Sequence, residues 1–93
     1  MYYTYVLCSE KDGRWYTGTT RDLRARYESH ANGRVGSTRY RRPLQLVYYE
    51  ACRQWEDALR RERYLKSGRG KRYLRQRLGG ELVALSRDKL ERH

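Results

Sequence analysis

The stretch YYTYVLCSEKDGRWYTGT, residues 2–19, decides the fold of this chain. Aromatic and β-branched residues fill positions 2–8 and return at 14–19, which is the composition of β-strands. Between these segments, Asp12-Gly13 is a hairpin turn signal. The stretch therefore predicts two antiparallel strands joined by a short turn.

Two tyrosines of this hairpin, Tyr5 and Tyr16, stand eleven positions apart. In simple antiparallel registers closed by the Asp12-Gly13 turn, their side chains emerge from the same face of the sheet, although a β-bulge would reset this parity. The chain has ten tyrosines and no phenylalanine, so most of its tyrosines must fill ordinary core positions. The shared face distinguishes Tyr5 and Tyr16 from the other tyrosines, because two phenols could share one surface there.

The remaining sequence predicts helices around a third strand. Thr20 or Asp22 caps a helix that runs to about Ala31, where Asn32-Gly33 ends it. Beyond it we expect a basic loop (33–43), a strand (44–51) and a helix (54–66) that ends at Ser67-Gly68. A basic helix (71–78) follows, and Gly79-Gly80 breaks the chain after it. The tail (81–93) is expected to direct Leu82, Leu85 and Leu90 inward. The predicted class is α+β, a small three-stranded antiparallel sheet flanked by helices in the order β-β-α-β-α-α.

Length and charge narrow the function. The 93 residues suit one domain (1–93), with a core over 2–78 and a C-terminal tail over 79–93. Lys and Arg number 22 against 11 acidic residues, a formal charge of +11 that favours nucleic acid as partner. Basic surfaces also occur in ribosomal and merely soluble proteins, so charge alone leaves those classes open.

Cysteine usage and hydropathy predict a cytoplasmic protein without a membrane segment. Cys8 and Cys52 lack the spacing of a disulfide framework or a zinc site, which fits a reducing compartment. No long apolar run or signal-type N-terminus is present in the sequence. We therefore expect a soluble, unprocessed chain.

The first predicted helix directs polar side chains inward. Steps of about 100° per residue place Leu23, Arg26, Tyr27 and His30 within one sector of the helix. Arg26 and His30 therefore face the protein body. The structural alternative is a snorkelling arginine beside a hydrogen-bonded histidine.

Glu62 occupies an unusual position on the later helix. The same geometry puts it in the middle of an apolar face made by Trp55, Ala58, Leu59 and Leu65, so its carboxylate is predicted to point toward the core. A charge placed there needs a cation or a hydrogen-bond network. Arg26 and a divalent ion are the candidates, and a purely structural salt bridge to an arginine is the alternative.

Taken together, these residues resemble the GIY-YIG nuclease superfamily. Tyr3-Thr4-Tyr5 matches the first motif and Tyr16-Thr17-Gly18 the second, and Arg26, His30 and Glu62 follow in the family's order. The resemblance covers residues 2 to about 78. The chain is similar to the small stand-alone bacterial members of this superfamily. In those members the string Ala58-Leu59-x-x-Glu62, followed by Leu65-Lys66 and a basic Gly/Ser turn, is familiar.

This chain also departs from the family pattern. Tyr3 and Thr4 replace Gly and Ile in the first motif, and Thr17 holds the middle of the second. Many members carry an asparagine beyond the metal-binding glutamate, whereas the only asparagine here is Asn32. Some members place a lysine directly after the second motif, where this chain has Thr19.

The resemblance implies a DNA endonuclease that hydrolyses phosphodiester bonds with one metal ion. Glu62 would hold a single Mg²⁺ or Mn²⁺, and Arg26 would bind the scissile phosphate. Tyr5 or Tyr16 would take the proton of the attacking water, and for this its pKa of about 10 must be lowered by Arg26 and the metal. His30 is the alternative base, so the assignment stays open among the three.

Exposed basic residues are expected to grip DNA through its phosphates without reading sequence. They are Arg34, Arg39, Arg41 and Arg42 in the loop, and Arg69, Lys71, Arg72 and Arg75 after the Glu62 helix. The Ser67-Gly68-Arg69-Gly70 turn either cradles a phosphate or only ends a helix.

DNA is the expected substrate in repair, recombination or turnover, with RNA left open, and DNA structure or a protein partner would supply specificity. The rival interpretation is a non-catalytic nucleic-acid-binding protein that keeps the nuclease fold. A third class is a purely structural basic protein.

Overall fold

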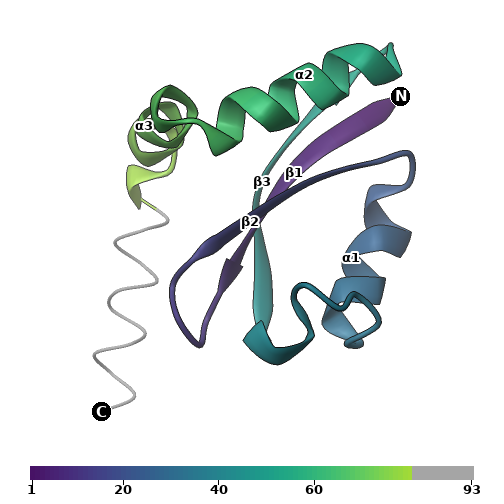
Figure 1. Cartoon of the computed structure of the whole chain (residues 1–93), viewed down its shortest axis with the longest axis vertical. Coiled ribbons are helices and arrows are strands. Elements are labelled where there is room, and N and C mark those ends of the chain that lie inside the picture. The colour runs from purple at the N-terminus through teal and green to yellow at the C-terminus, as the bar shows by residue number, and fades with distance from the viewer. Residues whose placement is uncertain (81–93) are drawn as a thin grey trace.

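The computed structural model describes residues 1–80, so the predicted tail with Leu82, Leu85 and Leu90 lies outside the described part. Within residues 1–80, three antiparallel strands form one sheet in the order β2-β1-β3, and helices cover both of its faces (Figure 1). The elements are β1 (Tyr2–Ser9), β2 (Trp15–Thr20), α1 (Leu23–Ala31), a 3₁₀ turn η1 (Arg39–Arg41), β3 (Leu44–Cys52), α2 (Trp55–Lys66) and α3 (Gly68–Arg77). The predicted α+β class and element order are confirmed.

Strand β1 is the centre of the domain because it pairs on both sides. Its residues from Thr4 to Ser9 are all buried, and successive side chains point to opposite faces. Val6 packs under α2 and α3 with Leu65, Leu74 and Leu78. On the opposite face, a second cluster, buried against α1, contains Tyr5, Leu7 and Leu44, with Leu23 and Tyr27 packed against it.

Strand β3 carries a bulge where it pairs with β1. Val6 pairs with Tyr48 while the next residue of β1, Leu7, pairs with Leu46, which leaves Val47 as the extra residue. Val47 and Tyr48 consequently both pack on the cluster under α2 and α3. Leu46 and Tyr49 are left on the face that α1 covers.

Helix α1 begins and ends with the predicted signals. Asp22 is its N-cap, and its Oδ1 accepts a hydrogen bond from the Ala25 backbone N–H at 3.0 Å, so Asp22 and not Thr20 is the cap. The helix ends at Ala31, and Gly33 follows with φ of 76°. That left-handed backbone turns the chain into the basic loop.

The boundaries predicted for α3 are wrong. The helix begins at Gly68 instead of residue 71, and it ends at Arg77, one residue before the predicted end at Leu78. Ser67 is its N-cap and accepts a hydrogen bond from the Gly70 N–H at 3.2 Å. The residues predicted as a turn therefore form the first turn of α3, because a serine cap compensates for the low helix propensity of the glycines.

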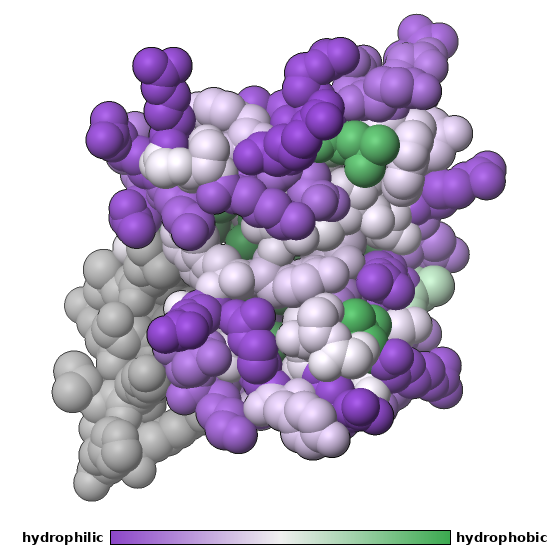
Figure 2. Space-filling model, in the orientation of Figure 1, coloured by the Kyte–Doolittle hydropathy of each residue, from purple (hydrophilic) through white to green (hydrophobic). Residues whose placement is uncertain are grey.

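The described surface is strongly hydrophilic. Figure 2 shows one face on which polar residues dominate and hydrophobic residues form only small separate patches. No helix within residues 1–80 has both the length and the apolar character needed to cross a bilayer. Most Lys and Arg side chains within residues 1–80 are exposed to solvent.

Gly70 is required where α3 packs against the end of α2. A Cβ at this position would overlap the backbone of Tyr64 and Leu65, which cannot move aside cheaply. We expect Gly70→Ala to lower the free energy of unfolding by about 1–3 kcal/mol in urea denaturation followed by circular dichroism. Gly68→Ala is the matched control, since nothing lies within 4 Å of its Cβ position, and it should raise the stability by about 0.4–1 kcal/mol. Equal effects at both positions would contradict this account of the packing.

Candidate active site

Tyr5 lies across the neighbouring strand at a position that only glycine allows. It pairs with Gly18 in the β1–β2 register, and its side chain is 1% exposed. A Cβ on Gly18 would overlap the Tyr5 hydroxyl and the ring carbon that carries it. The absence of a side chain at 18 therefore lets the Tyr5 hydroxyl reach over β2 toward the edge of the sheet.

A chain of hydrogen bonds leads from this hydroxyl into the core. Arg26 Nε donates to Tyr5 Oη at 3.3 Å, and Tyr5 Oη bonds to His30 Nε2 at 2.9 Å. His30 Nδ1 bonds to Thr38 Oγ1 at 2.7 Å. His30 and Thr38 are fully buried. The chain of hydrogen bonds therefore runs from Arg26 through Tyr5 and His30 to Thr38, in the loop that follows α1.

Tyr16 shares the face of Tyr5, and the parity prediction is confirmed. Tyr16 pairs with Leu7, two residues along β1 from Tyr5. Its ring centroid is 6.4 Å from that of Tyr5 and 5.0 Å from that of His30. Unlike Tyr5, Tyr16 is only half-buried, so it is the phenol of the pair with more access to solvent.

Glu62 approaches the same edge from the other face of the sheet. Its Oε1 accepts a hydrogen bond from the Thr19 hydroxyl at 2.7 Å, and its Oε2 accepts one from Lys66 Nζ at 2.9 Å. Thr19 directly follows Gly18 on β2. The carboxylate is also close enough to Tyr5 for its charge to raise the pKa of that phenol.

The predicted burial of Glu62 is wrong. Its side chain is 22% exposed, and the cation it meets is Lys66 and not Arg26. Of the apolar face expected around it, Ala58 and Leu65 are buried, whereas Trp55 and Leu59 are each 36% exposed. The reason is that α2 packs on the sheet through Ala58 and Leu65, while Glu62 lies over the edge strand where the carboxylate can bend out to solvent.

The sequence and the fold of this chain are similar to those of known proteins. A family model described as the GIY-YIG catalytic domain matches residues 1–79. The chain belongs to the GIY-YIG family. The UPF0213 protein SSP2268 of Staphylococcus saprophyticus is 40% identical over 67 residues, which are 71% of this chain and 80% of that protein. The UPF0213 protein SA0446 of Staphylococcus aureus is 40% identical over 68 residues, with the same coverage.

A solved structure supports the same relationship. The solution NMR structure of the UPF0213 protein BH0048 from Bacillus halodurans is 42% identical to this chain, with a TM-score of 0.52. The match covers 86% of this chain and 88% of that one. This GIY-YIG domain therefore has bacterial relatives of nearly its own length.

Burial and charge set the protonation states of Tyr5, Arg26 and His30 in this GIY-YIG domain. Burial raises the pKa of Tyr5, and the hydrogen bond from Arg26 opposes this without overcoming it. The expectation that Arg26 lowers a phenol pKa below its usual value is thus wrong for Tyr5. Burial, with the Arg26 charge, lowers the pKa of His30 to about 4, so this imidazole is neutral at pH 7. The Tyr5 hydrogen bond raises the pKa of Arg26, which stays charged.

The donor set at Glu62 fits a metal held loosely by the protein. Among residues 1–80, no group of three or more His, Cys, Asp or Glu side chains could hold an ion. A single accessible carboxylate beside the Thr19 hydroxyl suits Mg²⁺, which keeps several waters and often takes only one or two carboxylates. Glu62 is the residue of the described site that fits this role.

The residues predicted to bind DNA phosphates divide into two that stabilise the loop and six that are exposed. Arg41 pairs with Asp12 at 3.5 Å, and Arg42 donates to the Arg39 carbonyl at 2.9 Å, so both help to hold the loop in place. The remaining six are exposed, namely Arg34 and Arg39 in the loop and Arg69, Lys71, Arg72 and Arg75 on α3. Lys71 and Arg75 line a hollow of about 580 Å³ that also receives Arg14.

Sequence reasoning missed four residues that shape this site. Gly18 was taken only as a motif letter, and Thr19 only as a departure from the family's lysine. Lys66 follows Glu62 by four positions, and this i,i+4 spacing was a signal for the ion pair. Thr38 carries no local signal, because its contact with His30 depends on the path of the loop.

The lowered pKa of His30 predicts how stability changes with pH. Between pH 6.5 and about 4 the unfolded chain takes up a proton on His30 that the folded protein does not, so this contribution to stability is lost as pH falls through that window. We expect urea denaturation of the wild type and His30→Gln to show a steeper acid loss for the wild type. Parallel profiles would contradict a buried neutral His30.

Proposed function

We propose that this chain is a metal-dependent DNA endonuclease that hydrolyses phosphodiester bonds with a single divalent ion. The observation that carries the proposal is that Arg26 and Glu62, a fixed cation and an accessible carboxylate, approach Tyr5 over Gly18 from opposite faces of the sheet. The formal charge of +11 supports a polyanionic substrate.

Arg26 is proposed to bind the scissile phosphate. Its Nε donates to Tyr5 and the guanidinium also interacts with Tyr16, but the terminal nitrogens carry four further N–H groups, enough to donate to phosphate oxygens as well. Because the pKa of Arg26 is raised, the guanidinium keeps its charge as negative charge develops on the phosphate. Tyr5 and the buried His30 behind it fix the direction of this side chain.

Glu62 is proposed to hold Mg²⁺ or Mn²⁺, with Lys66 giving up its ion pair to make room. A divalent ion supplies charge stabilisation at the phosphate and acidifies its bound water. Thr19 donates to Oε1 and thereby orients the carboxylate, leaving Oε2 as the oxygen that becomes free when Lys66 moves. The carboxylate lies at the edge of the sheet, where a polymer substrate can reach it.

Tyr16 is proposed as the phenol that faces the attacking water. Tyr5 is 1% exposed and its pKa is raised by burial, so it is poorly suited to take a proton directly from solvent. His30 is fully buried and both of its ring nitrogens are hydrogen-bonded, to Tyr5 and Thr38, so it is also poorly placed to take a proton from solvent. The three candidates for the base thus differ in access, and Tyr16 has the most.

Glu62 gives the decisive test of catalysis. We expect Glu62→Gln to abolish nicking of supercoiled or branched DNA in Mg²⁺ or Mn²⁺ while DNA binding persists, because the amide is a poor ligand for a hard cation. The matched control is Glu50→Gln. Glu50 lies on β3, is similarly exposed (24%) and pairs with Arg61 of α2, so this variant should keep its activity. An RNA of the same sequence measures the substrate preference.

Two outcomes of that assay favour the rival functions. Tight, salt-dependent binding of every substrate without cleavage by the wild type would identify a nucleic-acid-binding protein that keeps the fold. Weak binding with little salt dependence would identify a structural basic protein, since several phosphate contacts produce a steep dependence on salt.

The division between the two tyrosines predicts unequal kinetic effects. We expect Tyr16→Phe to lower kcat by about 100-fold, the usual contribution of a proton-transfer group. Tyr5→Phe should lower it by less, about tenfold, and should raise KM, because Arg26 loses the hydroxyl that anchors its Nε. Single-turnover cleavage by the two variants separates the effects. Near-full activity of Tyr16→Phe would remove it as the base.

A further inference from the structure

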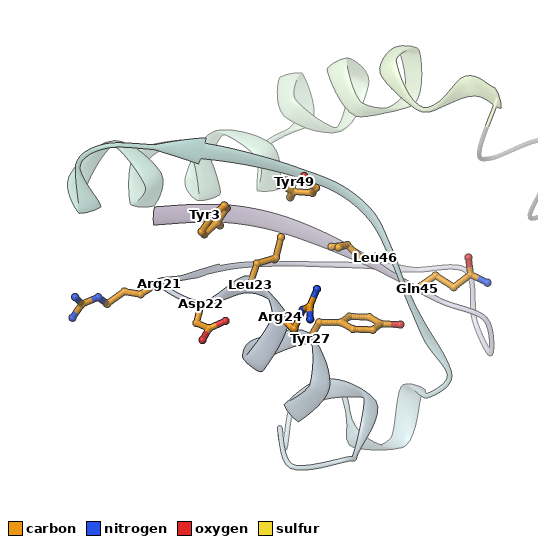
Figure 3. A pocket seen from close by; sticks show the side chains of 9 residues that line it. All are labelled: Tyr3, Arg21, Asp22, Leu23, Arg24, Tyr27, Gln45, Leu46 and Tyr49. Atoms are coloured by element: carbon orange, nitrogen blue, oxygen red, sulfur yellow. The ribbon is translucent and has the colours of Figure 1, made fainter. Parts of the chain in front are cut away.

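A second feature of the described surface lies beside the candidate site, where α1 faces β1 and β3. It is an open hollow of about 950 Å³ between α1 and strands β1 and β3, which we call the tyrosine groove (Figure 3). Its lining residues are Tyr3, Arg21, Asp22, Leu23, Arg24, Tyr27, Gln45, Leu46 and Tyr49. None of the five residues of the proposed catalytic cluster is among them.

The groove combines flat aromatic walls with an apolar floor. Tyr3 and Tyr49 lie with ring centroids 6.3 Å apart and their planes tilted by 59°, and Tyr49 is 55% exposed. In Figure 3, Leu23 points from α1 toward the strands and faces Leu46 below the two tyrosines. An exposed tyrosine face beside such a floor is the usual platform on which an unpaired base stacks.

The charges at the groove favour an anionic ligand. Arg21 and Arg24 are exposed at its wall, and neither forms an ion pair within residues 1–80. The one acidic lining residue, Asp22, uses its Oδ1 to cap α1. A second copy of this chain, also at +11, would be repelled from such a surface, so charge favours a polyanion with planar bases.

The groove is also close to the candidate active site. Tyr5 pairs with Gly18 on one side and with Tyr49 on the other, so the two sites lie on adjacent strand pairs. Two strand spacings of about 4.8 Å separate β2 from β3, which puts the groove within about 10 Å of the edge where Tyr5 meets Gly18. The β3 bulge is what leaves Tyr49 and Leu46 on this face together.

We propose that the tyrosine groove binds an unpaired nucleotide that flanks the scissile phosphate, with its base stacked on Tyr49 and its phosphate held by Arg24. The proposal rests on the proposed function for the identity of its ligand, and it deepens that function by giving the enzyme a preference for DNA with single-stranded segments. Stacking tolerates any base, so the groove would recognise DNA structure and not sequence.

Binding without cleavage tests the groove separately from catalysis. The full chain is titrated in EDTA against fluorescein-labelled oligothymidine and against a fully paired duplex, with fluorescence anisotropy as the readout. We expect Tyr49→Ala to weaken oligothymidine binding by about tenfold and to leave duplex binding unchanged. Its salt slope should stay the same, because no phosphate contact is lost, whereas Arg24→Ala should reduce the slope by about one.

The chain offers a matched control in Tyr40, which is 75% exposed and lies beside Arg39 in the loop but outside the groove. Tyr40→Ala should bind both probes like the wild type, and Tyr49→Trp should restore binding of the single strand by restoring a stacking surface. Circular dichroism confirms that each variant is folded.

Three results would overturn the proposal. They are wild-type affinity for oligothymidine in Tyr49→Ala, an equal loss for single strand and duplex, or an equal loss in Tyr40→Ala. Unchanged DNA affinities together with a change in the mass of the protein in solution would instead make the groove a contact between copies. The binding titration is run in EDTA and involves no cleavage. The result of the Glu62→Gln cleavage assay therefore does not change its interpretation.

Discussion

The contact between Tyr5 and Gly18 is the constraint on which the rest of the site depends. A side chain of any size at 18 would meet the Tyr5 hydroxyl, so the phenol could not lie across β2. Without that position, Arg26 would lose the oxygen that holds its Nε, and His30 would lose its partner in the core. One missing Cβ on an edge strand therefore sets the geometry of side chains from β1 and α1.

The electrostatics of the cluster follow from this buried phenol. His30 packs where ionisation is costly, and the nearby Arg26 charge disfavours it further, so the imidazole stays neutral and bonds to Tyr5 and Thr38. Arg26 then carries the positive charge on the α1 side of the site, and Glu62 carries the negative charge on the α2 side. Separation of the charges by β2 keeps Arg26 from pairing with Glu62, whose carboxylate pairs with Lys66 instead.

The sequence correctly predicted the side-chain directions that depend on the periodicity of a single strand or helix. The hairpin parity placed Tyr5 and Tyr16 on one face, and the helical period turned Arg26 and His30 inward, because both depend only on spacing along one element. Glu62 was misplaced because its burial depends on where α2 crosses the sheet, which no helical wheel contains. Thr38 was missed for the same reason, since a loop path brings it to His30.

The position of the site at a sheet edge has a physical reason. Arg26 and Glu62 belong to helices on opposite faces, and a central strand with side chains on both sides would keep them apart. An edge strand with glycine at the crossing point lets groups from both faces come close to each other. Such a site is open along the strand, which suits a long polymer better than a small molecule that needs enclosure. The edge position of Arg26 and Glu62 is therefore consistent with the polymer substrate proposed for this domain.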